Sequence, residues 1–515
     1  MKTHKTFKAK FHIATLIACC GFSSHLNLVF ADEEILAHPE VKGALRAIDA
    51  WLEGVQIYDR IPGISAGIVH DQELIWSKGY GFSNLEAKRP ADVDTLYSIC
   101  SISKLFTAIG IMQLRDANKL ALRDPVDDHL DWFDIRQAHE NSAPITIESL
   151  LTHTSGLPYE AGYPYWDGPD FPFPTRDRMI EGLKTQSTLY PARRVYQYSN
   201  LAVSIAGEIV RERSGQDYQD YVKANILDPL GLTSTRPYYP VEKRGEQLAI
   251  GYSGFSRDNK RKPVNAFFAG GLTPAMGFTS SVTDLAKFAS WQFRLLEEAG
   301  SEVLDAHTLR EMHRVHWVDP DRGIGFGVQR DGNTVVVGHS GGCPGYSTNF
   351  QMITKEKIAI VTMTNVSKGP TGRLNRNLLK TIRPALQAAQ STPVKTVPDF
   401  SMYEGNFDAP PWGGEMAIRQ WGDQLVAITI PSDDLGEAMT RLKHEDGHTF
   451  VRLTDDGERR ETWVFELGDD GRTQRVRYHD GYWIRIEGEQ DVTNMPDHCA
   501  GLVDAAGHGG RCERE

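Results

Sequence analysis

The sequence predicts an α/β (α+β) fold in which helices flank an antiparallel sheet and a small all-β barrel domain follows at the C-terminus. A helix and a strand hairpin near the N-terminus, and three strands leading into a helix before residue 392, predict the flanked sheet. After the segment 391–398, which has the composition of a linker, only strand patterns follow. This change of pattern separates a first domain, 32–392, from a barrel domain, 399–490.

Apolar spacing predicts each element of the first domain. Apolar residues at helical spacing indicate helices, and short alternating or continuous apolar runs indicate strands. Thr146 is expected to cap a helix, and Pro384 to kink or break one. In chain order, the predicted elements are a helix over 35–60, strands over 64–69 and 73–81, a helix from Ser101 to about residue 117, helices over 147–152, 201–210 and 282–296, strands over 334–339, 346–353 and 358–364, and a helix over 374–390.

The barrel domain is predicted from short strands separated by turn residues. His479-Asp480-Gly481 is typical of a hairpin turn, and no catalytic motif occurs in this part of the chain. The expected strands are 416–421, 425–430, 449–453, 462–467, 475–478 and 482–486. A Gly-rich tail, 491–515, follows them.

The composition is that of a folded, acidic protein. The chain has 515 residues, of which 40% are hydrophobic and 24% are charged, which is enough for two or three domains. Its net charge is −12, and removal of a leader with four lysines leaves −16. Because a polyanion binds poorly to so acidic a surface, the composition argues against nucleic acid as a partner.

The first 31 residues have the pattern of a secretory signal peptide. Residues 1–10 contain four lysines and no acid, and residues 11–20 form an apolar stretch too short to span a membrane. Cleavage after Ala31 predicts an exported, periplasmic protein. Residues 16–19 also resemble a bacterial lipoprotein box, which predicts a lipid anchor at Cys19 and a membrane-anchored lipoprotein instead.

Ser101 and Lys104 form the first candidate for chemistry. A serine at the start of a helix lies where free backbone N–H groups can meet a developing anion. Lys104 follows on the same helical face, and a serine hydroxyl needs such a base because it is a weak nucleophile. The alternative is an N-cap serine followed by a surface lysine.

Tyr198-Ser199-Asn200 forms the second candidate. A tyrosine can relay a proton if a nearby ammonium lowers its pKa from about 10, and we expect Lys104 to have this effect on Tyr198. The Asn200 amide can hold a substrate carbonyl or Lys104. The alternative is an ordinary turn before a helix.

Gly338-His339-Ser340-Gly341-Gly342 forms the third candidate, and it spells G-x-S-x-G. In a nucleophile elbow of this sequence, Ser340 would sit on a sharp turn between a strand and a helix. Here Cys343-Pro344-Gly345 and another extended segment follow the strand. The context therefore predicts a strand edge rather than an elbow.

Three further groups of residues could contribute to a site: the aromatic residues of a loop, the cysteines and three histidines. Aromatic residues in the Pro-rich loop 158–174 either line a substrate cleft or pin the loop to the surface. Cys100 and Cys343 flank candidate catalytic stretches, and we interpret them as buried small hydrophobes, leaving open whether they are bridged. Cys499 and Cys512 could pair in an oxidising compartment. No metal or cofactor is predicted, because His307, His313 and His316 match no zinc-ligand spacing and are interpreted as structural.

Together the three motifs resemble the serine β-lactamase and penicillin-binding-protein superfamily, in particular its class C branch with D-aminopeptidases, DD-peptidases and β-lactamase-like esterases. Ser-Ile-Ser-Lys matches S-x-x-K, Tyr-Ser-Asn matches Y-x-N, and His-Ser-Gly falls where β-lactamases carry K-T-G. The segment 150–158 also looks like one frequent in this branch. The resemblance covers about residues 40 to 390 and implies a β-lactamase/transpeptidase-like sheet. Residues from 399 resemble an appended lipocalin-like domain.

The resemblance also implies roles. Ser101 attacks a carbonyl and forms an acyl-enzyme, Lys104 and Tyr198 share the general-base work, and Tyr198 protonates the leaving group. Backbone N–H groups of Ser101 and Gly342 form the oxyanion hole. The implied substrate-binding and oxyanion residues are Asn200, His339, Gly341 and Gly342.

Two departures from the β-lactamase pattern bear on the substrate. His339 stands where β-lactamases have lysine, and an imidazole holds the carboxylate of a penicillin less firmly than an ammonium does. Arg193-Arg194 replaces a common Pro-Gly and either meets an acidic substrate or forms a solvated face. Because H-x-G occurs in peptidase members, the resemblance implies an exported serine hydrolase that cleaves an amide bond in a small peptide.

Several alternatives remain open. Within the same family they are a carboxylesterase acting on a small ester, a β-lactamase and a hydrolase of non-ribosomal peptides. An alternative of another class is a non-catalytic receptor for a peptide or a β-lactam. The presence of all three motifs argues against the receptor.

Overall fold

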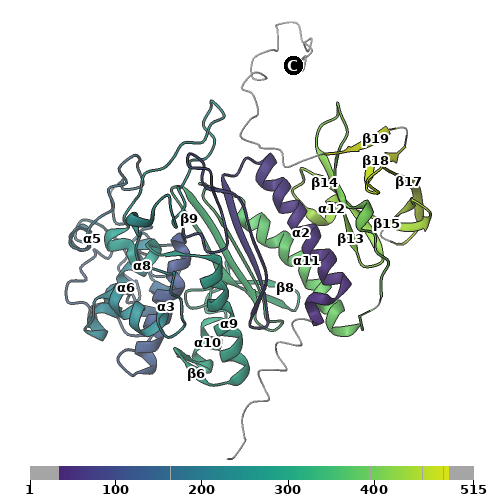
Figure 1. Cartoon of the computed structure of the whole chain (residues 1–515). Helices are drawn as coiled ribbons and strands as arrows, with labels where there is room; N and C mark the ends of the chain where they lie inside the picture. Colours follow the sequence, from purple (N-terminus) through teal and green to yellow (C-terminus); the bar gives the residue numbers. More distant parts are fainter. Residues whose placement is uncertain (1–33, 163, 395, 455, 480, 487–515) are drawn as a thin grey trace, which may run out of the picture.

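The computed structural model describes residues 34–486 except 163, 395, 455 and 480. In this part of the chain, a seven-stranded antiparallel sheet forms the centre of the first domain, with the order β3-β2-β1-β11-β10-β9-β8 (Figure 1). The predicted fold class is therefore confirmed. The strands are β1 (Gly63–His70), β2 (Glu73–Asn84), β3 (Arg89–Pro90), β8 (Gly327–Asp331), β9 (Thr334–Cys343), β10 (Tyr346–Ile353) and β11 (Ile358–Thr364).

The N-terminal hairpin and the last strands of the domain meet at the middle of this sheet. β1 pairs with β11, with Ile64 opposite Thr364, and both strands are buried along their whole length. Burial on both faces explains why these strands are nearly continuous apolar runs rather than alternating ones. The sheet thus joins the two ends of the domain.

Helices cover both faces of the sheet. On one face, α2 (Pro39–Tyr58) and α11 (Thr371–Ser391) share a hydrophobic core with the β1 side chains Ile64, Ala66 and Ile68. On the other face, a Cβ on Gly67 would lie 2.5 Å from Val282, the first residue of α9 (Val282–Glu298). α11 continues through Pro384 to Ser391 and is not broken there. Further helices on the α9 side are α3 (Ser103–Asp116), α4 (Ile147–Leu151), α5 (Arg176–Leu183), α6 (Asn200–Ser214), α7 (Tyr218–Val222), α8 (Thr273–Met276) and α10 (Ala306–Met312).

The C-terminal part is a closed antiparallel barrel, and its interior is filled by side chains. Rings of Tyr403, Phe450 and Phe465 pack edge to face with centroids 5.0 to 5.1 Å apart. Six strands match predicted ones, whereas β12 is only four residues long and β15 has a single buried residue, so neither has an apolar pattern. The strands are β12 (Gly405–Asp408), β13 (Glu415–Trp421), β14 (Gln424–Ile430), β15 (Met439–Asp446), β16 (Thr449–Leu453), β17 (Arg459–Leu467), β18 (Thr473–Tyr478) and β19 (Gly481–Arg485).

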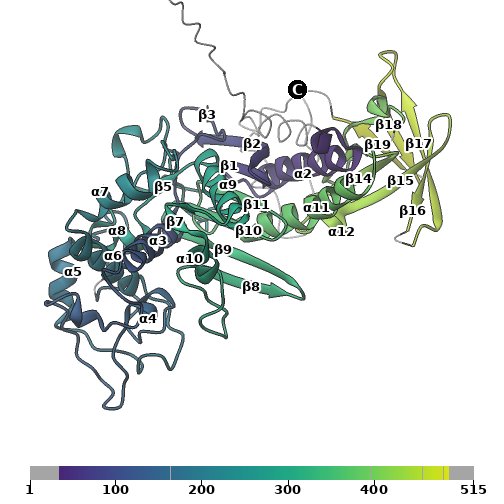
Figure 2. The ribbon, with the colours of Figure 1, turned by 90° about the horizontal axis from the view of Figure 1, so that it is seen from below.

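The barrel packs against α2 and α11, on the side of these helices away from the sheet (Figures 1 and 2). A Cβ on Gly43 of α2 would lie 2.6 Å from Trp421, and one on Gly54 would lie 2.4 Å from Ile430. The Trp421 indole donates to Glu40 at 2.6 Å. Two glycines on one helix face thus allow the barrel to approach the α2 backbone closely.

Some predictions concern residues outside the described part. The leader 1–31 with Cys19, the tail 491–515, and the cysteines Cys499 and Cys512 all lie there. Between residues 34 and 486, as far as the structure describes them, no helix has both the length and the apolar character that crossing a membrane requires.

Candidate active site

Ser101 lies in a tight turn at the start of α3. Residues Cys100–Ile102 form a 3₁₀ turn, and α3 proper begins at Ser103. Cys100 has a φ of 49°, in the left-handed region that residues other than glycine rarely adopt. Such a conformation persists only where the surroundings hold it. The predicted helix start is therefore a constrained turn that presents Ser101.

Lys104 is buried beside Ser101. Its side chain is 1% exposed, and its Nζ donates to Ser101 Oγ at 3.2 Å, to Asn200 Oδ1 at 2.8 Å and to the Ala275 carbonyl at 2.9 Å. The alternative of a surface lysine is thus wrong. Burial lowers the pKa of Lys104 to about 7, against the opposing charge of Glu160. An amine with this pKa is partly neutral at neutral pH and can accept a proton.

Tyr198 also reaches Ser101. It lies two residues before α6, and its hydroxyl donates to Ser101 Oγ at 2.9 Å. The expectation that Lys104 lowers the pKa of this tyrosine is wrong, because burial raises the pKa of Tyr198 far above 10. The Lys104 Nζ lies over the phenol ring, 4.8 Å from its centre. Tyr198 therefore stays protonated and can act as a proton donor.

Sequence reasoning missed His153 as part of this site. Its buried ring stacks on that of Tyr198, with centroids 4.3 Å apart, and its Nδ1 accepts the Ser199 N–H at 3.1 Å. Burial holds the pKa of His153 well below its usual value, so the ring is neutral. The segment 150–158 resembles one typical of the family branch, but nothing in the sequence indicates that its single histidine contacts the distant Tyr198.

The third motif lies in β9 rather than in an elbow. β9 continues through Cys343, and Ser340 is exposed and paired in register with Asn349. The prediction of a strand context is confirmed. His339 lies beside the site and is only partly exposed, and burial lowers its pKa, which keeps the imidazole neutral.

The two glycines that follow Ser340 have different surroundings. A Cβ on Gly341 would lie 2.2 Å from the Ile99 carbonyl oxygen and 2.4 Å from Thr348 Oγ1. Gly342 is exposed, and a Cβ there would meet nothing within 4 Å. Gly341 therefore allows β9 to lie against the turn that carries Ser101, and Gly342 faces open space at the same point.

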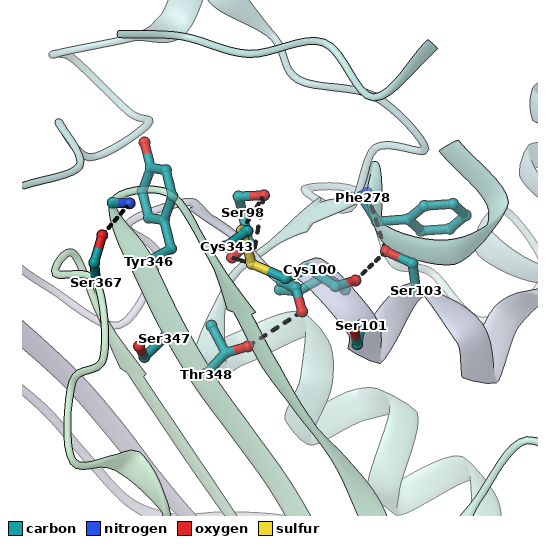
Figure 3. Close-up of a disulfide and its surroundings, with 12 residues drawn as sticks. Ser98, Cys100, Ser101, Ser103, Phe278, Cys343, Tyr346, Ser347, Thr348 and Ser367 are labelled. Atoms are coloured by element: carbon teal, nitrogen blue, oxygen red, sulfur yellow. Dashed lines mark hydrogen bonds between the residues drawn. A yellow bond between two sulfur atoms is a disulfide. The ribbon is translucent and has the colours of Figure 1, made fainter. Parts of the chain in front are cut away.

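A disulfide joins Cys100 and Cys343 (Figure 3). Both residues are buried, as expected, and the question whether they are bridged is answered by this bond, so they are more than small hydrophobes. The bond connects the residue before Ser101 to the residue after Gly342, across 243 positions of sequence. Beside it, Thr348 Oγ1 donates to the Ile99 carbonyl at 3.2 Å. The disulfide thus ties the turn to β9, and the hydrogen bond ties it to the neighbouring strand β10.

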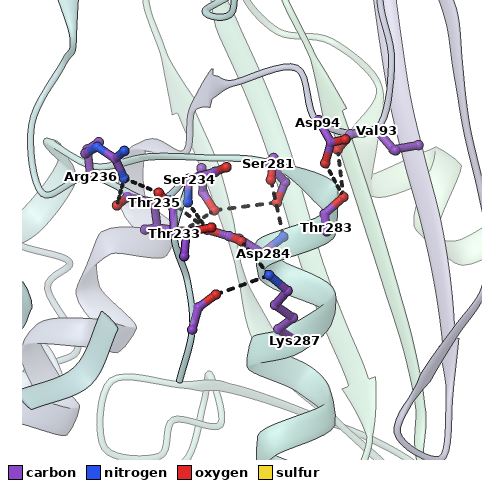
Figure 4. Close-up of polar contacts among 12 residues, drawn as sticks. Val93, Asp94, Thr233, Ser234, Thr235, Arg236, Ser281, Thr283, Asp284 and Lys287 are labelled. Atoms are coloured by element: carbon purple, nitrogen blue, oxygen red, sulfur yellow. Dashed lines mark hydrogen bonds and ion pairs between the residues drawn. The ribbon is translucent and has the colours of Figure 1, made fainter. Parts of the chain in front are cut away.

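A buried carboxylate supports the strand that leads to Ser101 (Figure 4). Asp284 accepts the N–H groups of Ser234 and Thr235 at 2.8 and 2.7 Å and the Thr235 hydroxyl at 2.9 Å. This cluster fixes the start of α9 next to β5 (Thr279–Ser280), which pairs with β4 (Tyr97–Ser98). β4 ends three residues before Ser101, so the cluster helps to position the turn.

A cleft of about 560 Å³ opens beside Ser101, between the Tyr198 region and strands β8 and β9. Tyr159 from the Pro-rich loop lines it, whereas Tyr165, Trp166 and Phe173 of the same loop pack against one another. Part of the aromatic loop thus lines the cleft, and the rest of its rings hold the loop in place, so each of the two alternatives applies to some residues. The cleft wall includes Ser101, Tyr159, Tyr198, Arg322, His339 and Gly342.

Comparisons with known proteins agree with this fold. Residues 48–382 match the family model described as Beta-lactamase. The chain is 25% identical over 520 residues to Beta-lactamase-like protein 2 of Dictyostelium discoideum, covering 97% of this chain and 87% of that protein. It is 29% identical over 512 residues to the Unguisins hydrolase ungD' of Aspergillus campestris, covering 87% and 93%.

Among solved structures, the octameric penicillin-binding protein homologue from Pyrococcus abyssi superposes with a TM-score of 0.58 at 24% identity, over 86% of this chain and 100% of that one. This similarity shows a shared fold. Because the family model covers well over half of the sequence, and because the S-x-x-K, Y-x-N and H-x-G motifs meet in one cleft, the chain belongs to the beta-lactamase family of serine hydrolases.

Proposed function

We propose that the chain is an exported serine hydrolase that cleaves an amide bond in a peptide through an acyl-enzyme on Ser101. The observation that carries this proposal is that Lys104 Nζ and Tyr198 O–H both converge on Ser101 Oγ, at 3.2 and 2.9 Å. A serine hydroxyl with a base and a proton donor in reach has what acyl transfer requires.

Acylation begins with Lys104 in its neutral form. A neutral amine has two N–H groups, and acceptors on Asn200 and Ala275 are in place for both. Its lone pair then faces Ser101 Oγ and takes the hydroxyl proton as the oxygen bonds to the substrate carbonyl carbon. The N–H groups of Ser101 and Gly342 stabilise the oxyanion that forms.

Collapse of the tetrahedral intermediate breaks the carbon–nitrogen bond. The leaving amine takes a proton from the Tyr198 hydroxyl, and Tyr198 regains one from the Lys104 ammonium. In deacylation, a water molecule loses a proton to the same pair and attacks the acyl carbon, and Ser101 Oγ leaves with a proton. Because the pKa of Tyr198 is raised by burial, the tyrosine serves as a relay that is protonated at rest.

One feature supports a peptide over a penicillin, and a second supports a substrate that carries an acidic group. A neutral His339 supplies no fixed positive charge where β-lactamases have lysine. The Arg322 guanidinium instead lies in the cleft wall, 5.0 Å from the centre of the Tyr196 ring, and its Nε is buried without a hydrogen-bond partner among the described residues. A guanidinium in the cleft wall suits a substrate carboxylate, which it binds more strongly than a neutral acceptor.

Export is supported by the leader pattern and by the Cys100–Cys343 disulfide, since disulfides persist mainly in oxidising compartments. The mature protein is either released after Ala31 or anchored through Cys19. Mass spectrometry of the protein from its native host distinguishes the two N-termini.

Labelling and a substrate panel test the proposal. A fluorophosphonate should form one adduct on Ser101, located by peptide mass spectrometry, and kcat/KM should be highest for peptides in a panel that also contains short esters and a cephalosporin. Hydrolysis of esters alone would make the protein a carboxylesterase, and efficient cephalosporin hydrolysis would make it a β-lactamase. Absence of any adduct would favour a receptor.

A further inference from the structure

We propose that Glu160 is a positioning residue for the base, Lys104. It fixes the orientation of the Asn200 amide that contacts Lys104, and its negative charge favours the ammonium form of Lys104. Glu160 belongs to the aromatic loop, not to any of the three motifs, and it is not among the residues that line the cleft beside Ser101. The inference rests on the proposed serine chemistry at Ser101. It assigns a function to the part of the loop that does not line the cleft.

Asn200 connects the carboxylate to the lysine. Its Nδ2 donates to Glu160 Oε1 at 2.8 Å, and its Oδ1 accepts from Lys104 Nζ at 2.8 Å. A carboxylate can only accept hydrogen bonds, so the amino end of the Asn200 amide must face Glu160. The amide oxygen is thereby directed at Lys104, where it takes one of the amine hydrogens and leaves the lone pair for Ser101.

The loop in turn holds Glu160 in place. The Trp166 indole donates to Glu160 Oε1 at 2.7 Å, and the hydroxyl of the buried Tyr165 donates to Oε2. The loop is attached to the start of α6, because the Asn200 N–H donates to the Tyr159 carbonyl at 2.9 Å. Two ring donors and one amide donor thus fix a carboxylate whose pKa is raised by burial.

The charges around Lys104 give Glu160 an electrostatic effect as well. Burial favours neutral Lys104, and the Glu160 carboxylate acts in the opposite direction. The other titratable groups at this centre are Tyr198, Tyr159, His153 and His339, whose pKa values favour their neutral forms. The Arg322 charge acts on Tyr198, His153 and His339. Glu160 therefore stabilises the ammonium that forms when Lys104 takes the Ser101 proton.

The test is the pH dependence of Ser101 labelling by a fluorophosphonate in the full-length protein. Glu160→Gln removes the negative charge, so Lys104 should lose its proton more easily. We expect the acid limb of the labelling rate to move down by about one pH unit. Tyr165→Phe removes one donor from the carboxylate, which should raise its pKa and move the limb in the same direction by less.

Glu208→Gln is the matched control. Glu208 is likewise a carboxylate whose pKa is raised by burial, but its partner is Arg176, at 2.7 Å. Its substitution should leave the limb in place. An unchanged limb in both Glu160→Gln and Tyr165→Phe, or an equal movement in Glu208→Gln, would overturn the role of Glu160.

Two further outcomes are decisive. If Glu160→Gln does not fold, as judged by circular dichroism, Tyr165→Phe alone decides, because it keeps both the ring and the carboxylate. If the wild-type protein shows no adduct on Ser101, the serine chemistry fails and the inference fails with it. Wild-type labelling with an unmoved limb in the variants overturns the role of Glu160 alone.

Discussion

Lys104 Nζ lies 3.2 Å from Ser101 Oγ inside a protein interior that leaves only 1% of the lysine side chain exposed. An exposed lysine is almost fully charged at neutral pH and cannot act as a base. Burial changes this, because it disfavours the charged form. The pair therefore sets the pH at which the site can start its reaction.

Activity should rise with pH through about 7. The proposed base is the neutral form of Lys104, whose pKa is lowered to about 7, so kcat/KM should fall as pH decreases below that value. The pKa of Tyr198 is raised, so its deprotonation should cause no loss between pH 7 and 9. Profiles of kcat/KM from pH 5 to 9 test this. An acid limb near pH 4 would point to a carboxylate base and contradict the assignment.

Two serines provide a direct comparison. Ser101→Ala should lower kcat by about 10⁴-fold or more, because it removes the nucleophile. Ser340→Ala should only weaken activity, because Ser340 is an exposed residue of β9 with neither Lys104 nor Tyr198 at its hydroxyl. Steady-state rates of the two purified variants decide between them. Full activity in Ser101→Ala would refute the mechanism.

Gly341 and Gly342 should respond differently to alanine. Gly341→Ala places a methyl group 2.2 Å from the Ile99 carbonyl oxygen, and such overpacking typically destabilises a protein by about 1–3 kcal/mol. Gly342→Ala meets nothing within 4 Å and should leave the free energy of unfolding unchanged. Urea unfolding of both variants measures this. Equal stability would show that β9 can move away from the turn without loss.

Reduction of the disulfide should slow turnover. Cys100 and Cys343 flank the two N–H groups of the proposed oxyanion hole, and loss of one such donor lowers kcat by about 10²-fold or more. We expect a smaller loss, about tenfold, because the Thr348 bond to Ile99 remains. Activity before and after treatment with a phosphine reductant, and again after reoxidation, measures it. Undiminished activity with free thiols confirmed by mass would show that the bond is dispensable.

Short motifs with fixed spacing made part of this site predictable. Ser101 and Lys104 are three residues apart, and this spacing brings two side chains to the same face whether the turn between them is α-helical or 3₁₀. The contact of Tyr198 with them depends on the fold, and the family resemblance supplied it. Glu160 and His153 could not be found, because each acts through a partner far along the chain and neither belongs to a repeated pattern.

The depth of burial of a side chain was the second property that could not be predicted from the sequence. The sequence gives no measure of how deeply Tyr198 is enclosed, so the expected direction of its pKa shift was wrong. For the same reason, Cys100 and Cys343 could be recognised as buried but not as adjacent. Spacing along one helix can be predicted from sequence, whereas desolvation and distant pairing require the assembled interior.

The contact of Trp421 and Ile430 with the glycine face of α2 has a consequence for how the chain can be divided. A shortened protein that stops at residue 392 would expose the apolar helix surface that the barrel otherwise covers. It should therefore self-associate rather than behave as an independent enzyme. The segment after 392 resembles a spacer in composition, yet the parts on either side of it share one interior. Loss of the barrel during evolution would therefore require polar substitutions on the helix surface that the barrel now covers.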